Sequence, residues 1–211
     1  MYIAIEGVIG VGKTTLARLL EPVFDAELLL EVFEENPFLS DFYSDRERYA
    51  FQTQIFFLLS RYHQQRRAVP EILKRQSLIS DYTFAKDSLF ARINLAGDEL
   101  EMYNRVHEAL AEKIVPPDLL VYLRASTDVL IGRIATRDRS YERNMDRAYI
   151  EKLNQAYEDF FSQPYGNTLV LTIDTDPLDF VHFPAHLKLI ENRIRASLNL
   201  PPYQEQLLFE K

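Results

Sequence analysis

A glycine-rich segment near the amino terminus, residues 7–14, constrains the possible folds of this chain more than any other feature. It matches the complete pattern G-x-x-x-x-G-K-[ST], follows a β-rich apolar run at residues 2–5 and opens a segment with helical periodicity. A strand that turns through glycines into a helix presents backbone amides to phosphate oxygens. The pattern predicts a nucleoside triphosphate loop formed by Gly7, Val8, Ile9, Gly10, Val11, Gly12, Lys13, Thr14 and Thr15.

Two side chains of this segment suit a bound triphosphate. Lys13 can reach the β and γ phosphates, and the hydroxyl of Thr14 can ligate Mg2+. The competing interpretation is a glycine-rich turn that matches the pattern by chance. The lysine, the threonine and the strand–helix context argue against it, so we expect a nucleoside triphosphate to bind here with Mg2+.

Apolar segments alternate with helical patterns along the rest of the chain. Strand-like runs lie at residues 2–5, 27–33, 77–81, 119–123 and 169–173, and helical periodicity at 13–20, 46–67, 99–114, 127–136, 147–161 and 184–198. This alternation predicts a parallel sheet that is covered on both faces. Because no repeat or linker divides the sequence, we expect a single α/β domain over residues 1–211, a three-layer sandwich with a five-stranded parallel sheet.

Composition and charge exclude several classes of protein. The chain has 211 residues, a formal net charge of -8 and no cysteine. The absence of cysteine excludes disulfide scaffolds and thiolate zinc sites, and it suits a reducing cytoplasm. No apolar run approaches the roughly 20 residues of a membrane helix, and the acidic balance argues against nonspecific binding to nucleic acid. We therefore expect a cytoplasmic protein with neither a membrane nor a nucleic-acid partner.

An arginine cluster and two strand-end carboxylates favour a kinase over other proteins with such a loop. Between positions 133 and 147, five arginines outnumber three acidic residues. Several guanidinium groups can clamp a transferring phosphoryl group, although a solvated helix end is the alternative. Glu31 follows the second predicted strand and Asp81 ends the third, so both should face the loop. One carboxylate can take a proton from an acceptor hydroxyl while another holds Mg2+.

Several short segments follow one another in a characteristic order: residues 7–15, 31–39, 51–61, 81–83 with Asp87, 133–139 and 179–180. This set resembles the deoxynucleoside kinase family, most closely its bacterial deoxyadenosine and deoxyguanosine kinase branch. The resemblance covers nearly the whole chain. It implies a P-loop kinase-type sandwich with an arginine-rich lid at about residues 137–147, a homodimer, and phosphorylation of a deoxynucleoside 5′-hydroxyl by Mg-ATP. A purine is implied; deoxyadenosine is favoured, and deoxyguanosine and deoxycytidine stay open.

The resemblance also implies which residues carry the reaction. Glu31 matches the general base on the 5′-hydroxyl, and Thr14 and Asp81 would organise Mg2+. Asp179 and Phe180 lie near the loop that holds the donor adenine. The cationic residues that would stabilise the transferred charge are Lys13, Arg133, Arg137 and Arg139.

Five further positions match the family's nucleoside-binding residues. Tyr43 and Glu142 match a pair that shares the sugar 3′-hydroxyl, and Gln54 matches the glutamine that reads the base edge. Arg61 and Asp87 match the polar pair that completes base recognition. Taken singly, each has a plain structural alternative; Arg61, for example, could extend along its helix surface.

Two positions depart from the family pattern. Tyr82 stands where an arginine near the 5′-hydroxyl is usual, and a lid arginine is the candidate to compensate for it. Asp138 replaces the glycine of the lid's Arg-Gly-Arg, so the turn loses a residue suited to positive φ. A nucleoside monophosphate kinase of the thymidylate kinase type is the first alternative, but it would need an arginine at position 82. The second is a non-catalytic P-loop protein that binds nucleotide as a switch.

Overall fold

Parallel strands joined by helical connections form one central sheet. The computed structural model describes residues 1–143 and 145–202. Within them the strands run in the order β2-β3-β1-β4-β5, and each neighbouring pair is parallel. The predicted α/β class with a five-stranded parallel sheet is confirmed. The strands are β1 (Tyr2–Gly7), β2 (Ala26–Leu29), β3 (Ser77–Ser80), β4 (Leu119–Arg124) and β5 (Leu169–Asp174).

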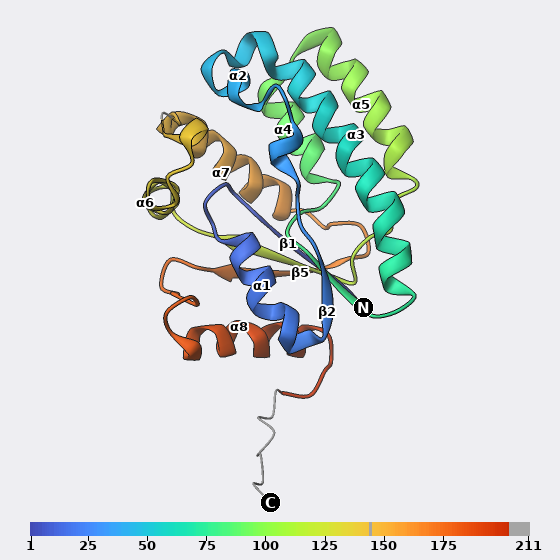
Figure 1. The fold of residues 1–211 in the computed structure, drawn as a ribbon, viewed down its shortest axis with the longest axis vertical. Coiled ribbons are helices and arrows are strands. Elements are labelled where there is room, and N and C mark those ends of the chain that lie inside the picture. The colour runs from blue at the N-terminus through green and yellow to red at the C-terminus, as the bar shows by residue number, and fades with distance from the viewer. Residues whose placement is uncertain (144, 203–211) are drawn as a thin grey trace, which may run out of the picture.

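Helices cover both faces of the sheet, as Figure 1 shows. On one face lie α1 (Lys13–Phe24) and α8 (Pro184–Ser197), where Arg195 of α8 donates to the carbonyl of Val23 in α1 at 3.2 Å. The other face carries α3 (Arg46–Leu73), α4 (Lys86–Asn94), α5 (Gly97–Ala111) and α7 (Arg147–Phe161). Short helices border the carboxyl ends of the strands: η1 (Phe33–Glu35), α2 (Leu39–Ser44), α6 (Thr127–Arg137) and η2 (Ser140–Glu142).

Some boundaries differ from those that the sequence predicts. β2 ends at Leu29 and not at residue 33, because the chain turns there toward η1, and Glu31 consequently lies beyond the strand. α3 extends past residue 67 because Val69 and Ile72 are buried against the sheet. The sequence pattern predicts no helix at α4, since its nine residues are too few for a reliable periodicity.

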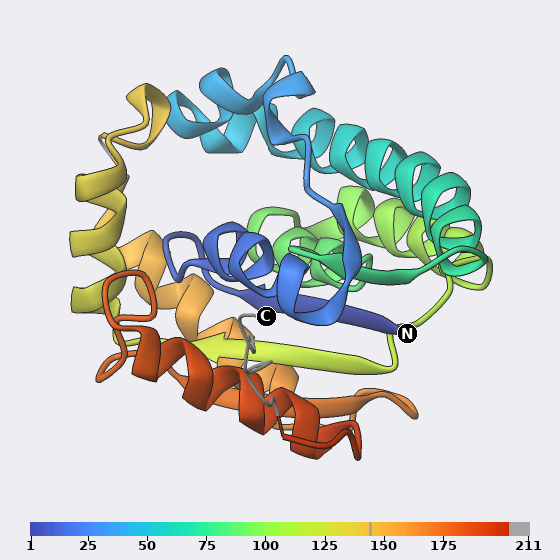
Figure 2. The ribbon, with the colours of Figure 1, turned by 60° about the horizontal axis from the view of Figure 1, so that its bottom comes forward.

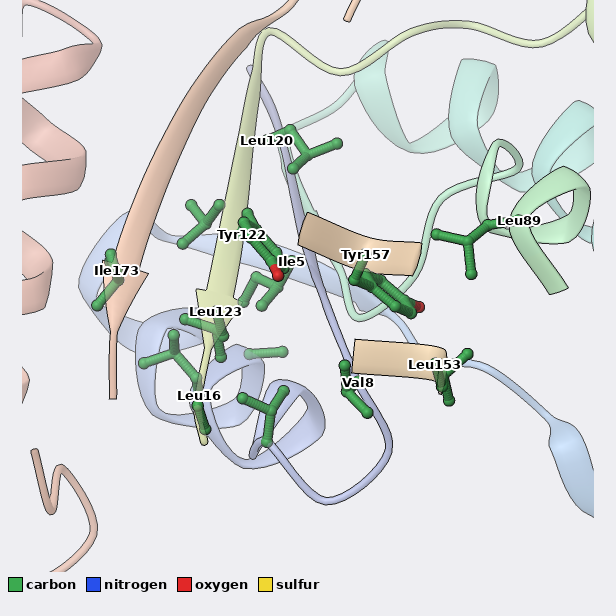
Figure 3. Close-up of a cluster of buried hydrophobic side chains, with 14 of the residues drawn as sticks. Ile5, Val8, Leu16, Leu89, Leu120, Tyr122, Leu123, Leu153, Tyr157 and Ile173 are labelled. Atoms are coloured by element: carbon green, nitrogen blue, oxygen red, sulfur yellow. The ribbon is translucent and has the colours of Figure 1, made fainter. Parts of the chain in front are cut away.

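The core holds the strand ends in fixed positions (Figure 3). Ile5 of β1, Leu120 of β4 and Leu16 of α1 are fully buried, and each such side chain contributes roughly 1.5–3 kcal/mol by its burial. The buried carboxylate of Glu6 accepts hydrogen bonds from both the backbone N–H (2.6 Å) and the hydroxyl (2.9 Å) of Thr83. These bonds tie β1 to the segment after β3. In the described part of the chain, no helix has the length and apolar character needed to cross a bilayer.

Candidate active site

The glycine-rich loop lies where the order of the strands reverses. β1 has β3 on one side and β4 on the other, and the chain leaves β1 through this loop into α1. Ligands of open parallel sheets bind beyond the carboxyl ends of the strands at such a point. A cavity lies there, lined by the loop, by the segments after β2 and β3, by α3, and by the loop after α6.

Glycines in the loop allow contacts that a larger residue would block. Gly10, with φ 88°, and Gly12, with φ 106°, have backbone conformations that L-residues rarely adopt. A Cβ atom on Gly10 would lie 2.7 Å from Cγ1 of Ile134 on α6, and one on Gly12 would lie 3.0 Å from Cζ of Phe180. α6 and the segment after β5 thus close directly onto the loop.

Lys13 lies across the loop that precedes it. Its Nζ donates to the carbonyl oxygens of Gly7 at 2.7 Å and Val8 at 3.1 Å. Withdrawal from water, with the neighbouring charge of Lys86, lowers the pKa of Lys13 to about 8. The loop's other side chains divide between core, cavity and solvent: Val8 and Val11 are buried, Ile9 lines the cavity, and Thr15 is exposed.

Thr14 and Asp81 form a pair of hard oxygen donors beside the loop. The hydroxyl of Thr14 donates to Oδ2 of Asp81, whose Oδ1 accepts from the backbone N–H of Glu31 at 2.8 Å. Magnesium in phosphoryl-transfer sites takes such oxygens, usually with one or two carboxylates and the substrate's phosphates. The pair therefore fits Mg2+.

Glu31 lies between two cations. Its Oε1 accepts from Nε of Arg61 at 2.9 Å and from Nη2 of the same guanidinium, while Oε2 accepts from Nζ of Lys86 at 2.7 Å. Burial alone would raise the pKa of this carboxyl, but the charges of Arg61 and Lys86 outweigh burial and hold the pKa well below its usual range. Glu31 is consequently an ionised acceptor at any ordinary pH.

Gln54 and Arg61 lie together at one end of the cavity, and Asp87 pairs with Arg61 without lining the cavity itself. All three are buried, and the remaining guanidinium nitrogen of Arg61, Nη1, pairs with Oδ1 of Asp87. Among the described residues, neither Oε1 of Gln54 nor Oδ2 of Asp87 receives a hydrogen bond. A buried acceptor without a donor is costly, so this end of the cavity is built to receive N–H groups.

The loop after α6 meets α2 over the cavity, as Figure 2 shows for the two segments. The ring of Tyr43 on α2 stacks on Tyr141 with centroids 5.9 Å apart. Glu142 is buried and pairs with Arg137 and with Arg139, the latter at 3.7 Å. Burial raises the pKa of Tyr43 well above its usual value, helped by the nearby tyrosines and Glu142. Part of the expected lid, residue 144, lies outside the described residues.

Arg133, Asp179 and Phe180 are grouped away from this cavity. Arg133 donates to the carbonyls of Val11 at 3.2 Å and Thr175 at 2.9 Å, and so ties the loop to the segment after β5. Asp179 accepts from the backbone N–H groups of residues 181 and 182. Phe180 is buried against Gly12. The structure therefore separates Arg133 from Arg137 and Arg139, which line the cavity.

Comparisons with known proteins agree with this geometry. The deoxynucleoside kinase family matches residues 3–199. The chain belongs to this family. A deoxyguanosine kinase of Bacillus subtilis (strain 168) is 37% identical over 184 residues, 85% of this chain and 89% of that protein. A deoxyadenosine kinase of Lactobacillus acidophilus is 30% identical over 215 residues, 94% of this chain and 98% of its own.

A solved structure extends the likeness to the fold. The structure of deoxyadenosine kinase from M. mycoides with bound dATP has a TM-score of 0.81 and 29% sequence identity to this chain. It covers 92% of this chain and 99% of its own. The chain is a deoxynucleoside kinase with the P-loop kinase fold that the sequence predicts.

Sequence reasoning missed one charged residue of this kinase's cavity, Lys86. The signal was weak, since a lysine beside Asp87 in a short helix is usually a solvated surface residue. Tyr82, by contrast, does not line the cavity: it is fully buried in a second apolar cluster and donates to Oε1 of Gln64. The charged neighbours of Glu31 are thus Lys86 and Arg61, and the lid arginines pair with Glu142 instead.

Asp138 stands where the family pattern has glycine, and it adopts the left-handed conformation that glycine favours. Its φ of 50° and ψ of 44° are left-handed, and it ends α6 as the family glycine would. Aspartate tolerates this region better than most residues. Its carboxylate also pairs with Arg143 at 2.7 Å, so the turn forms without glycine.

Proposed function

We propose that this kinase transfers the γ-phosphoryl group of Mg-ATP to the 5′-hydroxyl of a purine deoxynucleoside. The observation that carries the proposal is one cavity lined by both the phosphate loop and the ionised Glu31, with Gln54 at its far end. Such a cavity can hold a nucleoside with its 5′ end toward Lys13. The curated relatives, named deoxyguanosine and deoxyadenosine kinases, support the purine class.

The protein takes little part in the covalent chemistry of this reaction. The 5′-oxygen forms a bond to the γ-phosphorus, the bond from that phosphorus to the β–γ bridging oxygen breaks, and ADP leaves. Glu31 accepts the hydroxyl proton from its place between Arg61 and Lys86. A carboxylate has about four lone-pair positions, and the hydrogen bonds of Glu31 fill both on Oε1 but leave one on Oε2 for the 5′-hydroxyl.

Glu31 is a weak base because its pKa is held low. Its main contribution is therefore to orient the hydroxyl in line with the phosphorus and to receive the proton late, which suits a loose transition state. Thr14 and Asp81 would hold Mg2+, which when bound neutralises phosphate charge. Lys13, Arg137 and Arg139 add positive charge around the transferring group, whereas Arg133 supports the loop through Val11.

The sugar is held from the lid side. Tyr43 and Glu142 line the cavity next to each other, and together they offer a phenol and a carboxylate to a 3′-hydroxyl. Arg137 and Arg139 hold Glu142 in place through ion pairs. A hydroxyl buried between these groups would be paired on both its donor and acceptor sides.

The base is one that carries an exocyclic amino group. Oε1 of Gln54 and Oδ2 of Asp87 are buried acceptors that lack donors among the described residues. Adenine, guanine and cytosine each present an amino group, whereas thymine presents a single ring N–H. Because Arg61 is engaged by two carboxylates, it is poorly available to guanine O6, and this keeps deoxyadenosine ahead of deoxyguanosine and deoxycytidine.

Phosphoryl transfer from Mg-ATP to the four deoxynucleosides and to thymidine monophosphate tests the proposal. We expect the highest kcat/KM with deoxyadenosine or deoxyguanosine, less with deoxycytidine, and little with thymidine. Preference for thymidine monophosphate would establish the monophosphate kinase alternative. ATP binding without transfer to any of the five would establish the non-catalytic alternative.

Four further features belong to the same proposal. The donor adenine would lie by the segment that contains Asp179 and Phe180, because this segment packs on Gly12 of the loop. We also propose a homodimer, a cytoplasmic location and one domain over residues 1–211, of which 203–211 lie outside the described residues. Gel filtration with light scattering would test the dimer.

A further inference from the structure

Lys86 lies in a place that fold stability does not explain. It is 8% exposed and is the first residue of α4, where the helix dipole disfavours a cation. Its Nζ is 2.7 Å from Oε2 of Glu31, the one carboxylate within ion-pair distance among the described residues. The burial of a lysine at an unfavourable helix end indicates a functional role in the cavity that it lines.

The other cations of the cavity are already engaged. Lys13 donates to two loop carbonyls, Arg61 is shared by Glu31 and Asp87, and the lid arginines both pair with Glu142. An ammonium group has three N–H donors. Lys86 uses one on Glu31, and its remaining donors are available to an oxygen that enters the cavity.

Lys86 and the phosphate loop share one cavity. Lys86 lines it together with Lys13 of the loop and with Glu31. Two ammonium groups that line one cavity are stabilised when an anion lies between them. A phosphoryl group in transit from the loop to an oxygen beside Glu31 is such an anion.

We infer that Lys86 is a catalytic residue of the proposed reaction, whose ammonium group donates to the phosphoryl group as it passes to the 5′-oxygen. As the bond from the 5′-oxygen to phosphorus forms and the bond to the bridging oxygen breaks, negative charge is spread over the equatorial oxygens. Lys86 stabilises that charge and stays protonated, while the hydroxyl proton goes to Glu31. Tyr82 cannot do this because its side chain is fully buried, does not line the cavity and donates to Gln64.

Steady-state kinetics of Lys86→Met and Lys86→Arg test the inference, which rests on the proposed function. We expect kcat to fall about 10²- to 10³-fold in Lys86→Met, with the nucleoside KM changed less than about threefold. Lys86→Arg, which keeps the charge, should retain activity within about tenfold of the wild type. The exposed Lys74, changed to Met, serves as the control and should leave both parameters unchanged.

The stability of the variant separates a catalytic charge from a merely structural one. A charge that is needed only for the fold would lower the melting temperature of Lys86→Met, and kcat would recover with the fraction of folded protein. A charge that acts on the phosphoryl group lowers kcat in protein that is fully folded. A wild-type kcat in folded Lys86→Met would overturn the inference, whereas an inactive wild type would overturn the proposed function itself.

Chemical rescue gives a second, independent measurement. Because the chain has no cysteine, Lys86→Cys introduces a single thiol. Its thiolate displaces bromide from 2-bromoethylamine, which forms a carbon–sulfur bond and restores an ammonium group at about the length of lysine. Recovery of at least about tenfold in kcat, in protein shown by mass to carry one such group, supports the inference. Fully alkylated protein that stays as slow as Lys86→Cys contradicts it.

Discussion

The donor half and the acceptor half of the cavity are built in opposite ways. The donor half is one contiguous segment, Gly7 to Thr14, in which backbone groups and a helix terminus would face the phosphates of the proposed ATP. The acceptor half assembles side chains far apart in sequence: Glu31 meets Arg61 across 30 positions and Lys86 across 55. A site made of backbone leaves its pattern in a short motif, whereas a site made of paired side chains does not.

The two halves also differ in charge. In the acceptor half, Arg61 and Lys86 face Glu31 and Asp87, so two cations balance two anions, and none of the four side chains is more than 13% exposed. In the donor half, Lys13 has no such carboxylate partner in the described structure and draws on loop carbonyls instead. A balanced, enclosed half suits an uncharged nucleoside, and a cationic, open half suits a polyanion.

The largest effect is expected from a substitution of Glu31, which lies at the centre of the acceptor half. Glu31→Gln keeps the shape but removes the proton acceptor, so we expect nucleoside binding to remain nearly intact and kcat to fall about 10³-fold. Calorimetric titration and initial rates measure the two quantities. Glu35→Gln, an exposed change in the same segment, is the control; full activity of Glu31→Gln would remove Glu31 from the role of base.

Gln54→Leu should have the next largest effect, and it affects selectivity more than chemistry. An apolar side chain leaves the base edge unpaired, which is expected to lower kcat/KM for the preferred nucleoside by about 10- to 1000-fold. Competition assays with pairs of deoxynucleosides measure the change. Gln52 lies on the same helix but is exposed, so Gln52→Leu should behave as wild type. Wild-type selectivity in Gln54→Leu would show that another group reads the base.

A smaller effect is expected in the donor half, where the affinity for ATP should depend on pH. Lys13 binds phosphate as a cation, and its pKa in the free enzyme is lowered to about 8. The affinity for ATP is therefore highest below that pH and falls as the pH rises through it. We expect the affinity to fall about 3- to 10-fold between pH 7 and 9. Titration calorimetry measures this slope. Lys13→Arg stays protonated and should bind ATP with a flat profile; equal slopes in both proteins would contradict the assignment.

The smallest effect is expected at the edge of the lid. Asp138→Gly removes the cost of a left-handed aspartate, which stabilises the fold. It also raises the entropy of the unfolded chain and removes an exposed ion pair with Arg143, which both destabilise the fold. Because these effects oppose one another, the unfolding midpoint should move by less than about 3 °C. Asp138→Ala loses the same pair and keeps the backbone cost. It should therefore melt below Asp138→Gly, as calorimetry can measure; the reverse order would mean that the entropy which glycine adds to the unfolded chain outweighs the backbone cost at this turn.

Much of the fold could be predicted because its signals are local. The loop pattern fixes the β1–α1 turn, and short β-rich runs separated by helical periodicity predict all the strands of the sheet. Glu31 and Asp81 could be placed near the loop because parallel strands end at a common edge, and the hydrogen bonds from Thr14 and from the Glu31 backbone place them there. Boundaries such as the end of β2 were less accurate, since turns depend on tertiary contacts.

Other features had no local signal. The long helix α3 predicts a buried stripe but does not reveal that Arg61 bridges Glu31 and Asp87. α4 is too short for its periodicity to be recognised, and Lys86 was missed with it. Arg133 lies on the same helix as Arg137, yet it is held by carbonyl groups of Val11 and Thr175. Only packing decides which of several arginines reaches a cavity.

The sequence by itself determined that a P-loop opens an α/β sheet and that carboxylates follow two of its strands, because these features depend on backbone geometry and on residues adjacent in the chain. The tertiary structure decided how the acceptor half is charged. It turned Tyr82 into the core and brought Lys86 to Glu31. A single buried charge is stable only with a partner, and that partner is supplied by whichever element the fold brings alongside.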